Sequence, residues 1–182
     1  ERLSLLGNDV NRAISHLPGI AGGDLSARLH IRGGTHDENT FLMDGMPLND
    51  PFHVKDVGGI LGVINSFSIS NAEIITDGAP VEYGNHLSGV MRLHSDSFND
   101  ESNWSLGMNL LDSKIKGSGN LYSELSTWLF VLRKGDFDTI SQYSEVDFGD
   151  YSPDYSDAFI KLEFELTEDN QLSLYHLKSE DR

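Results

Sequence analysis

The feature that most constrains this chain is a strict alternation of apolar and polar side chains in its second half. From position 160 to 166 the even positions are apolar and the odd ones charged: Ile160, Leu162, Phe164 and Leu166 against Lys161, Glu163 and Glu165. Successive side chains of a β-strand point to opposite faces, so this segment predicts a strand with one apolar and one charged face. Trp104 and Leu106 begin a similar pattern.

Turn-forming residues divide this half into five predicted antiparallel strands. We place them at residues 104–111, 114–119, 125–134, 157–167 and 172–181. The segment 135–156 between the third and fourth strands is long, acidic and aromatic, whereas the turn at 167–171 is short.

An antiparallel sheet with one apolar and one charged face has two interpretations. In a soluble sandwich, the charged face meets water and the apolar face forms the core. In an outer-membrane barrel, the apolar face meets lipid and the polar face lines the lumen. Alternation alone does not separate them, because both architectures have a period of two.

The composition excludes several classes of partner. The 182 residues include 29 acidic and 13 basic side chains, for a formal net charge of −16. Such a charge argues against nucleic acid and against electrostatic binding to an anionic membrane surface. The chain has no cysteine, which excludes disulfides and thiolate metal sites. No apolar run approaches the roughly 20 residues of a transmembrane helix.

The first half predicts a small mixed α+β domain. Residues 9–17 form an amphipathic pattern that Pro18-Gly19 ends, with Val10, Ile14 and Leu17 on one face. Short strands follow at 27–31, 40–43, 69–76 and 89–93. Glycines stand at nearly every junction, where tight turns require φ > 0. A polar linker at 96–103 separates the two halves.

Acids and histidines are dense between residues 30 and 53. His30, His36, Asp37 and His53 are metal-ligand types, yet no tight pair spacing such as HExxH is present, so we expect no metal site. Asp44-Gly45 reads as a turn, and Asp37, Glu38 and Asn39 suit hydrogen bonds to local backbone N–H groups.

The first half resembles the plug domain of TonB-dependent outer-membrane receptors over about residues 9–94. The matching segments come in the family's order: Leu17–Ile20, Ile31–Gly33, Thr40–Leu48, Ala72–Pro80, Tyr83-Gly84 and Leu87–Leu93. Each is weak alone, and their order and spacing carry the resemblance. The segments 37–39 and 49–53 resemble the corresponding segments of a branch of the family that is common among Bacteroidetes-type receptors.

The resemblance implies an α+β plug domain over residues 1–95, followed by a linker at 96–103 and antiparallel strands of an incomplete transmembrane β-barrel. Residues 104–182 would be the first five strands of a 22-stranded barrel in the bacterial outer membrane. The long segment 135–156 then becomes an extracellular loop and the turn at 167–171 a periplasmic one, as such barrels prefer. We expect the chain to be part of a longer receptor and to begin after the signal peptide and the TonB box.

The resemblance also implies roles for particular residues. Arg32 would pair with barrel-wall carboxylates beyond residue 182 and lock the plug, because an unpaired enclosed charge is unfavourable. The loops after Arg32 and after Asp44-Gly45 would be apices that contact an external ligand. The candidate contacts are Thr35, His36, Asn49, Asp50, Phe52 and His53. Asp77 and Glu82 depart from the family pattern and weaken any second arginine lock.

The expected activity is energy-coupled uptake of a nutrient. The implied partners are the TonB–ExbB–ExbD complex, an external nutrient, outer-membrane lipid and a surface lipoprotein. No catalytic motif, cofactor or metal is expected, so the chain is not predicted to be an enzyme. The alternative is a self-contained, soluble, acidic β-rich binding domain.

Overall fold

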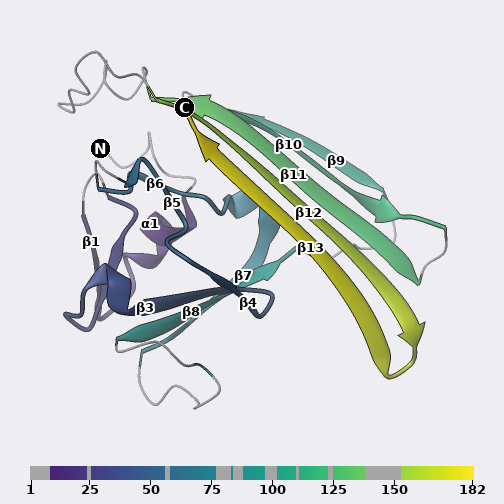
Figure 1. The fold of residues 1–182 in the computed structure, drawn as a ribbon, viewed down its shortest axis with the longest axis horizontal. Helices are drawn as coiled ribbons and strands as arrows, with labels where there is room; N and C mark the ends of the chain where they lie inside the picture. The colour runs from purple at the N-terminus through teal and green to yellow at the C-terminus, as the bar shows by residue number, and fades with distance from the viewer. Residues whose placement is uncertain are drawn as a thin grey trace. The chain divides into compact units, whose positions relative to one another are not determined.

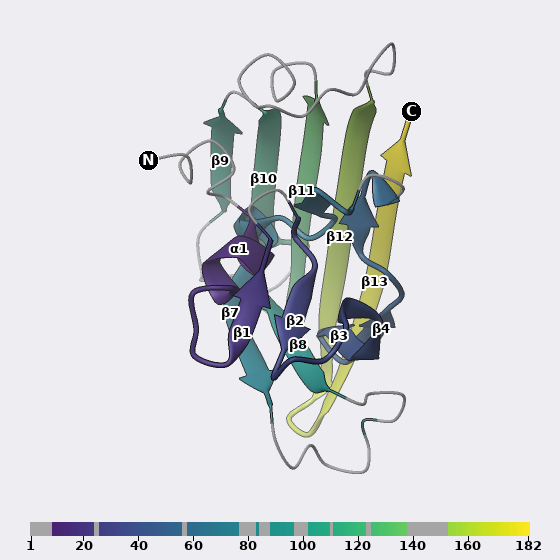
Figure 2. The same ribbon diagram turned by 90° about the vertical axis from the view of Figure 1, so that its left-hand side faces the viewer.

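A computed structural model describes residues 9–23, 26–55, 58–76, 83, 88–96, 102–109, 111–122, 125–137 and 153–182. The chain divides into two compact units, Glu1–Ser95 and Asp96–Arg182. Figures 1 and 2 show their elements from two directions. Within the described ranges, no helix is long and apolar enough to cross a membrane.

The first unit contains one α-helix and eight short strands in its described part. These are α1 (Val10–Ile14), β1 (Ile20–Gly22), β2 (Leu29–Ile31), β3 (Asn39–Met43), β4 (Met46–Leu48), β5 (Phe52–His53), β6 (Leu61–Gly62), β7 (Ile69–Ile75) and β8 (Gly89–Ser95). Two 3₁₀ turns, His36–Glu38 and Ser66–Ser68, precede β3 and β7. The prediction of a small mixed α+β unit agrees with this content, although helix is scarce.

Helix α1 is fixed at its first turn by a buried aspartate. The carboxylate of Asp9 accepts hydrogen bonds from the backbone N–H of Asn11 at 2.8 Å and, through its second oxygen, from Gly62 at 2.5 Å. One side chain therefore caps α1 and joins it to the β5–β6 hairpin. The helix is shorter than expected. Leu17, predicted on its buried face, lies beyond the helix and is 49% exposed, so that assignment was wrong.

A four-stranded sheet in the order β4-β3-β8-β7 forms the centre of the first unit. Strands β3 and β8 are parallel, from the pair Asn39–Gly89 to the pair Met43–Leu93. Their side chains supply much of the buried core, including Phe41, Met43, Val90, Met91 and Leu93. Because the pair is parallel, the starts of β3 and β8 share one end of the sheet. Ser95 leaves from the other end.

The turn between β3 and β4 lies at the same end as Ser95. Asp44 and Gly45 have φ values of +48° and +81°. The Asp44 N–H donates to the Leu93 carbonyl at 2.9 Å, and its carboxylate accepts from the Ser95 N–H at 2.9 Å. The turn interpretation of Asp44 is therefore confirmed, and its side chain also ties the turn to the end of β8.

Replacing Asp44 with alanine should lower the free energy of unfolding of the full-length protein by about 1–3 kcal/mol. The change removes the acceptor for the Ser95 N–H and places alanine at a positive φ. Asp44→Asn keeps an oxygen acceptor and a residue type that tolerates this conformation, so it should lose less than half as much. Denaturant titration of the two variants measures the difference. Equal losses would show that the side-chain acceptor contributes nothing.

The second unit is a single antiparallel sheet in the order β13-β12-β11-β10-β9 (Figure 2). Its strands are β9 (Asn103–Met108), β10 (Asp112–Asn120), β11 (Ser126–Asp136), β12 (Asp154–Thr167) and β13 (Asn170–Asp181). The fourth and fifth strands start earlier than predicted, and β12 carries an irregularity between Glu165 and Thr167. The acidic and aromatic segment 138–152 lies outside the described residues.

The two faces of this sheet differ sharply. Residues paired across neighbouring strands share a face, so the pairing places most large apolar side chains together. Many of them are exposed: Trp104, Leu106, Met108, Leu132, Ile160, Leu166, Leu172 and Leu174. The opposite face carries ion pairs, including Arg133 with Asp157 and Lys161 with Glu163. We call these the apolar face and the charged face.

Candidate functional site

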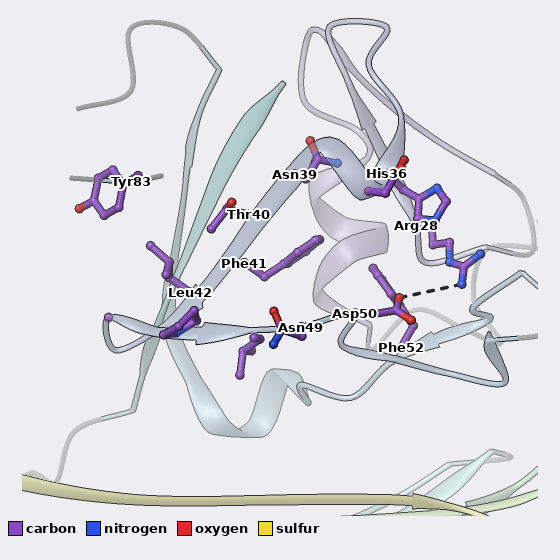
Figure 3. Close-up of a pocket in the computed structure, with 14 residues that line it drawn as sticks. Arg28, His36, Asn39, Thr40, Phe41, Leu42, Asn49, Asp50, Phe52 and Tyr83 are labelled. Carbon is purple, nitrogen blue, oxygen red and sulfur yellow. Dashed lines mark ion pairs between the residues drawn. The ribbon is translucent and has the colours of Figure 1, made fainter. Parts of the chain in front are cut away.

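A hollow of about 640 Å³ opens in the first unit (Figure 3). Elements on several sides contribute to it: the 3₁₀ turn before β3, the β3–β4 hairpin, and the segment leading into β5. Its lining consists of Arg28, His36, Asp37, Asn39, Thr40, Phe41, Leu42, Gly45, Pro47, Leu48, Asn49, Asp50, Phe52 and Tyr83. Such a mixture of aromatic, aliphatic and polar groups is typical of a small-molecule site.

Asp50, at the hollow, lies close to two basic side chains. Its carboxylate lies 3.9 Å from the Arg28 guanidinium and 3.3 Å from the Lys55 ammonium. Arg28 also donates to the Lys55 carbonyl at 3.2 Å and lies over the Phe52 ring, 5.9 Å from its centroid. Figure 3 shows Arg28 and Asp50 facing each other at the edge of the hollow. This arrangement fixes Arg28 between a carboxylate and an aromatic face.

Phe41 and Phe52 form an aromatic wall. Their rings meet edge to face with centroids 5.6 Å apart. Both residues are buried, so the wall is part of the core as well as part of the hollow. Amide and hydroxyl groups from Asn39, Thr40 and Asn49 lie around it. The hollow can therefore stack a planar or apolar group while hydrogen-bonding its substituents.

The 3₁₀ turn at His36–Glu38 holds its polar side chains through local hydrogen bonds. The Thr35 N–H donates to the Glu38 carboxylate at 2.9 Å. A hydrogen bond from the Thr35 side chain lowers the pKa of Asp37 below its usual value. Asn39 instead reaches across to β2, donating to the Leu29 carbonyl at 2.8 Å. The prediction of a bond to a local backbone N–H is thus confirmed for Glu38 and wrong for Asn39, whose side chain donates to a distant carbonyl.

Strand direction brings two separate loops to one end of the hollow. β4 runs antiparallel to β3, pairing Leu48 with Phe41, so the chain after Leu48 returns toward the start of β3. Asn49 and Asp50 therefore join His36 in the lining. The Asp44-Gly45 turn itself lies at the opposite end of β3, beside Ser95. Of the β3–β4 hairpin, only the residues that follow β4 lie at the same end of the sheet as the loop after Arg32.

Of the six candidate ligand contacts, four line the hollow: His36, Asn49, Asp50 and Phe52. Thr35 is exposed beside them but is outside the lining. His53 is completely buried in β5 and does not line the hollow, so the structure does not place it as a ligand contact. Arg28, Asn39, Phe41 and Tyr83 were missed. Arg28 could have been suspected because it is a cation directly before the short strand Leu29–Ile31.

Arg32 occupies an exposed turn after β2. Its φ is +50°, and its N–H donates to the Gly19 carbonyl at 2.8 Å. Arginine is uncommon in this left-handed region, since the side chain carries a steric penalty there. The backbone of this turn is therefore held by the hydrogen bond to Gly19, and the Arg32 side chain is exposed.

Two described histidines, His30 and His36, make local contacts in the first unit. His30 and His36 lie edge to face with ring centroids 6.3 Å apart, and His30 contacts the Gly34 carbonyl through Nδ1 at 3.0 Å. In the part of the chain that the structure describes, no group of three or more histidine or acidic side chains could hold a metal ion.

The first unit is thus a small domain with a mixed sheet and a hollow, and an antiparallel sheet follows it in the chain. Residues 4–90 match the family model described as TonB-dependent Receptor Plug Domain. A search of curated proteins finds no match.

Solved structures with a similar fold are receptors. The siderophore receptor PirA from Acinetobacter baumannii has a TM-score of 0.68 and 17% identity, over 98% of this chain and 30% of that one. The pyoverdine outer membrane receptor FpvA from Pseudomonas aeruginosa, bound to pyoverdine, has a TM-score of 0.68 and 18% identity, over 98% and 26%. A complex of FpvAI with pyocin S2 has a TM-score of 0.66 and 19% identity, over 98% and 23%. The chain spans less than a third of the receptors it matches.

Proposed function

We propose that this chain is the plug and the first barrel strands of a TonB-dependent outer-membrane transporter. Residues 1–95 are the plug, 96–103 the linker, and 104–182 the first five strands of a 22-stranded barrel. The transporter imports an external nutrient with energy from the TonB–ExbB–ExbD complex and catalyses no reaction. We place it in the Bacteroidetes-type branch, where a surface lipoprotein is a further partner. The plug match supports the class.

The apolar face of the second unit is the first support for a membrane sheet. Leu106 is 81% exposed and Met108 is 84% exposed, whereas Arg133 and Asp157 on the charged face are buried. A soluble sandwich would bury the apolar face and expose the charges. The observed polarity fits strands that turn apolar side chains toward lipid, and it disfavours the alternative of a soluble binding domain.

The single observation that carries the proposal is that the apolar region runs diagonally across the strands. The rung of paired residues through Leu106, at the centre of the apolar part of β9, ends on β13 at Lys178. The apolar part of β13, Leu172 to Leu174, is centred five residues earlier. The apolar region therefore shifts by about five residues along the strands, at roughly 3.3 Å each, while it crosses four strand spacings of roughly 4.8 Å. If this region lies parallel to the membrane plane, the strands tilt from the membrane normal by about 40°. Strands of outer-membrane barrels tilt by about 35–45°.

The hollow supports a role in ligand contact. Its lining includes His36, Asn39, Asn49 and Asp50, which lie at the end of the central sheet opposite Ser95, where the chain leaves the plug. If the chain leaves on the periplasmic side, as in the family, this end faces outward. His36, Asn49, Asp50 and Phe52 are then the plug's contacts with an external ligand, and Arg28 positions Asp50. Thr35 stays a candidate at the rim, and His53 acts only by supporting Phe52.

Fractionation of cells that express the full-length gene tests the proposal. The protein should appear in the outer-membrane fraction and migrate faster on gels when left unboiled, as a folded barrel does. Recovery from the soluble fraction, with no heat-dependent change in migration, would support the binding-domain alternative.

Arg32 supplies a test of plug locking. Arg32→Glu in the full-length protein should increase the leakage of large antibiotics, because it sets like charges against the proposed wall carboxylates. Arg32→Lys keeps the charge and should leak less than the glutamate variant. Antibiotic sensitivity that is unchanged from wild type in Arg32→Glu would remove the lock assignment.

A further inference from the structure

Two histidines from different elements of the first unit lie side by side. His30 belongs to β2, and His36 begins the 3₁₀ turn that precedes β3. Their rings meet at an interplanar angle of 79° with centroids 6.3 Å apart. His30 is exposed and His36 is partly exposed, so both residues are accessible to solvent. We call these two residues the histidine pair.

The hydrogen bond of His30 favours the tautomer of a metal ligand. Its Nδ1 lies 3.0 Å from the Gly34 carbonyl, which can only accept, so Nδ1 carries the proton when this bond is made. Nε2 of the neutral ring then keeps its lone pair. Histidines that ligate metal ions commonly donate their other ring N–H to a backbone carbonyl, which fixes the tautomer and the ring orientation. His30 already has such an outer partner.

The backbone between the two histidines is held by local hydrogen bonds. The Gly34 N–H donates to the Ile31 carbonyl at 2.9 Å, which closes the tight turn after β2. In the next turn, the Glu38 N–H donates to the Thr35 carbonyl at 3.1 Å, and the Glu38 carboxylate accepts from the Thr35 N–H at 2.9 Å. The fold therefore brings the two rings together, although the sequence lacks the tight pair spacing of HExxH.

The separation of the rings is close to that of two ligands on one ion. Imidazoles that bind a tetrahedral ion through nitrogens at about 2.0–2.1 Å have ring centroids about 5 Å apart. The remaining difference of about 1 Å requires only small rotations of side chains that solvent reaches. The Asp37 carboxylate next to His36 has a lowered pKa and attracts a cation. Repulsion from Arg28 is reduced, because Arg28 faces Asp50 (Figure 3).

We propose that the histidine pair binds one divalent copper or zinc ion. Imidazole nitrogens suit both metals, and copper binds such sites more tightly than other divalent first-row ions do. Two protein ligands leave the remaining coordination positions to water or to a small chelator that carries the ion. Because His36 also lines the hollow, such a chelator would lie in the hollow. The site goes beyond the transport role proposed above, since it requires only the fold of the first unit.

Titration of the full-length protein with copper(II) tests the site. Each of His30→Ala and His36→Ala should weaken the binding of one copper equivalent by about a hundredfold, because two ligands on one scaffold bind far more tightly than one. At copper concentrations that saturate the pair but not a single imidazole, the double variant should lose the same one equivalent. The electron paramagnetic resonance spectrum of that equivalent, taken as wild type minus variant, should show two imidazole nitrogens.

His16→Ala is the matched control, because His16 is an exposed histidine of the first unit outside the pair. This variant should keep the copper equivalent, and circular dichroism checks that every variant is folded. Loss of the equivalent in His16→Ala, or loss of two equivalents in the double variant, would overturn the shared site. Full copper binding by both single variants would overturn it as well. None of these outcomes depends on where the protein fractionates, so failure of the metal site leaves the proposed transporter standing.

Discussion

Replacing Arg133 with methionine should lower the free energy of unfolding of the full-length protein by about 3–5 kcal/mol, because it leaves the Asp157 carboxylate buried without its cation. The Arg133 Nε–H donates to Asp157 Oδ2 at 2.7 Å, and a second guanidinium N–H donates to the same oxygen. The guanidinium also lies over the Tyr155 ring, 5.1 Å from its centroid. Both members of the ion pair are buried.

A second variant separates the loss of a pair from the loss of packing. Arg133→Met combined with Asp157→Leu removes both charges, so stability should return to within about 1 kcal/mol of wild type. Lys178→Met is the control. It breaks an exposed pair with Glu180, 3.4 Å long, and should change stability by less than about 1 kcal/mol. If Arg133→Met were as mild as this control, the buried pair would have no role in holding β11 to β12.

Replacing Leu174 with arginine should destabilise the reconstituted full-length protein by about 2–4 kcal/mol, the effect of a cation near the middle of a lipid-facing band. Leu174 is 50% exposed and lies on the apolar face of β13. In water such a substitution would be close to neutral, because an exposed leucine gains little from burial. Denaturant titration in vesicles gives the free energy, and the outer-membrane yield in cells should fall in parallel.

The neighbouring residue is a matched control. Ser173 points to the charged face, where its hydroxyl lies 3.5 Å from the Glu163 carboxylate. An arginine at position 173 meets that carboxylate, so Ser173→Arg should change stability by less than about 1 kcal/mol. The two substitutions add the same side chain one residue apart. Equal effects at both positions would rule out lipid on the apolar face.

Local patterns were enough to predict the strands of the second unit and the glycine-rich turns of the first. Alternation in 160–166 identifies a strand because the period of two is imposed by backbone geometry. The alternation did not show whether the apolar face contacts lipid or the protein core, since both environments accept leucine. The diagonal drift of the apolar band supports the proposal that lipid meets the apolar face. That drift depends on which residues pair across strands, and a single strand contains no such information.

The hollow was predicted only in part. His36 and Asn49 were found because both lie in loops of the resemblance, whereas Arg28 lies before β2 and Tyr83 lies far along the chain. His53 looked equivalent to its neighbour Phe52, yet successive side chains of a strand point to opposite faces, and of the two only Phe52 lines the hollow. Positive φ at Asp44 and Val54 was equally hidden, because tertiary contacts rather than residue preference hold these conformations.

The parallel pairing of β3 with β8 sets a condition on when the plug can fold. Asn39 and Gly89 are neighbours in the sheet but about fifty residues apart in the chain. A contact of this range is slow to form, because a long loop must close before any stabilising interaction is gained. Strand β3 therefore lacks one of its two partners until the last strand of the domain is available. If the chain is exported as proposed, the first unit would remain open to proteases and chaperones until residue 95 has crossed, and its sheet would form only as the first strands of the second unit emerge.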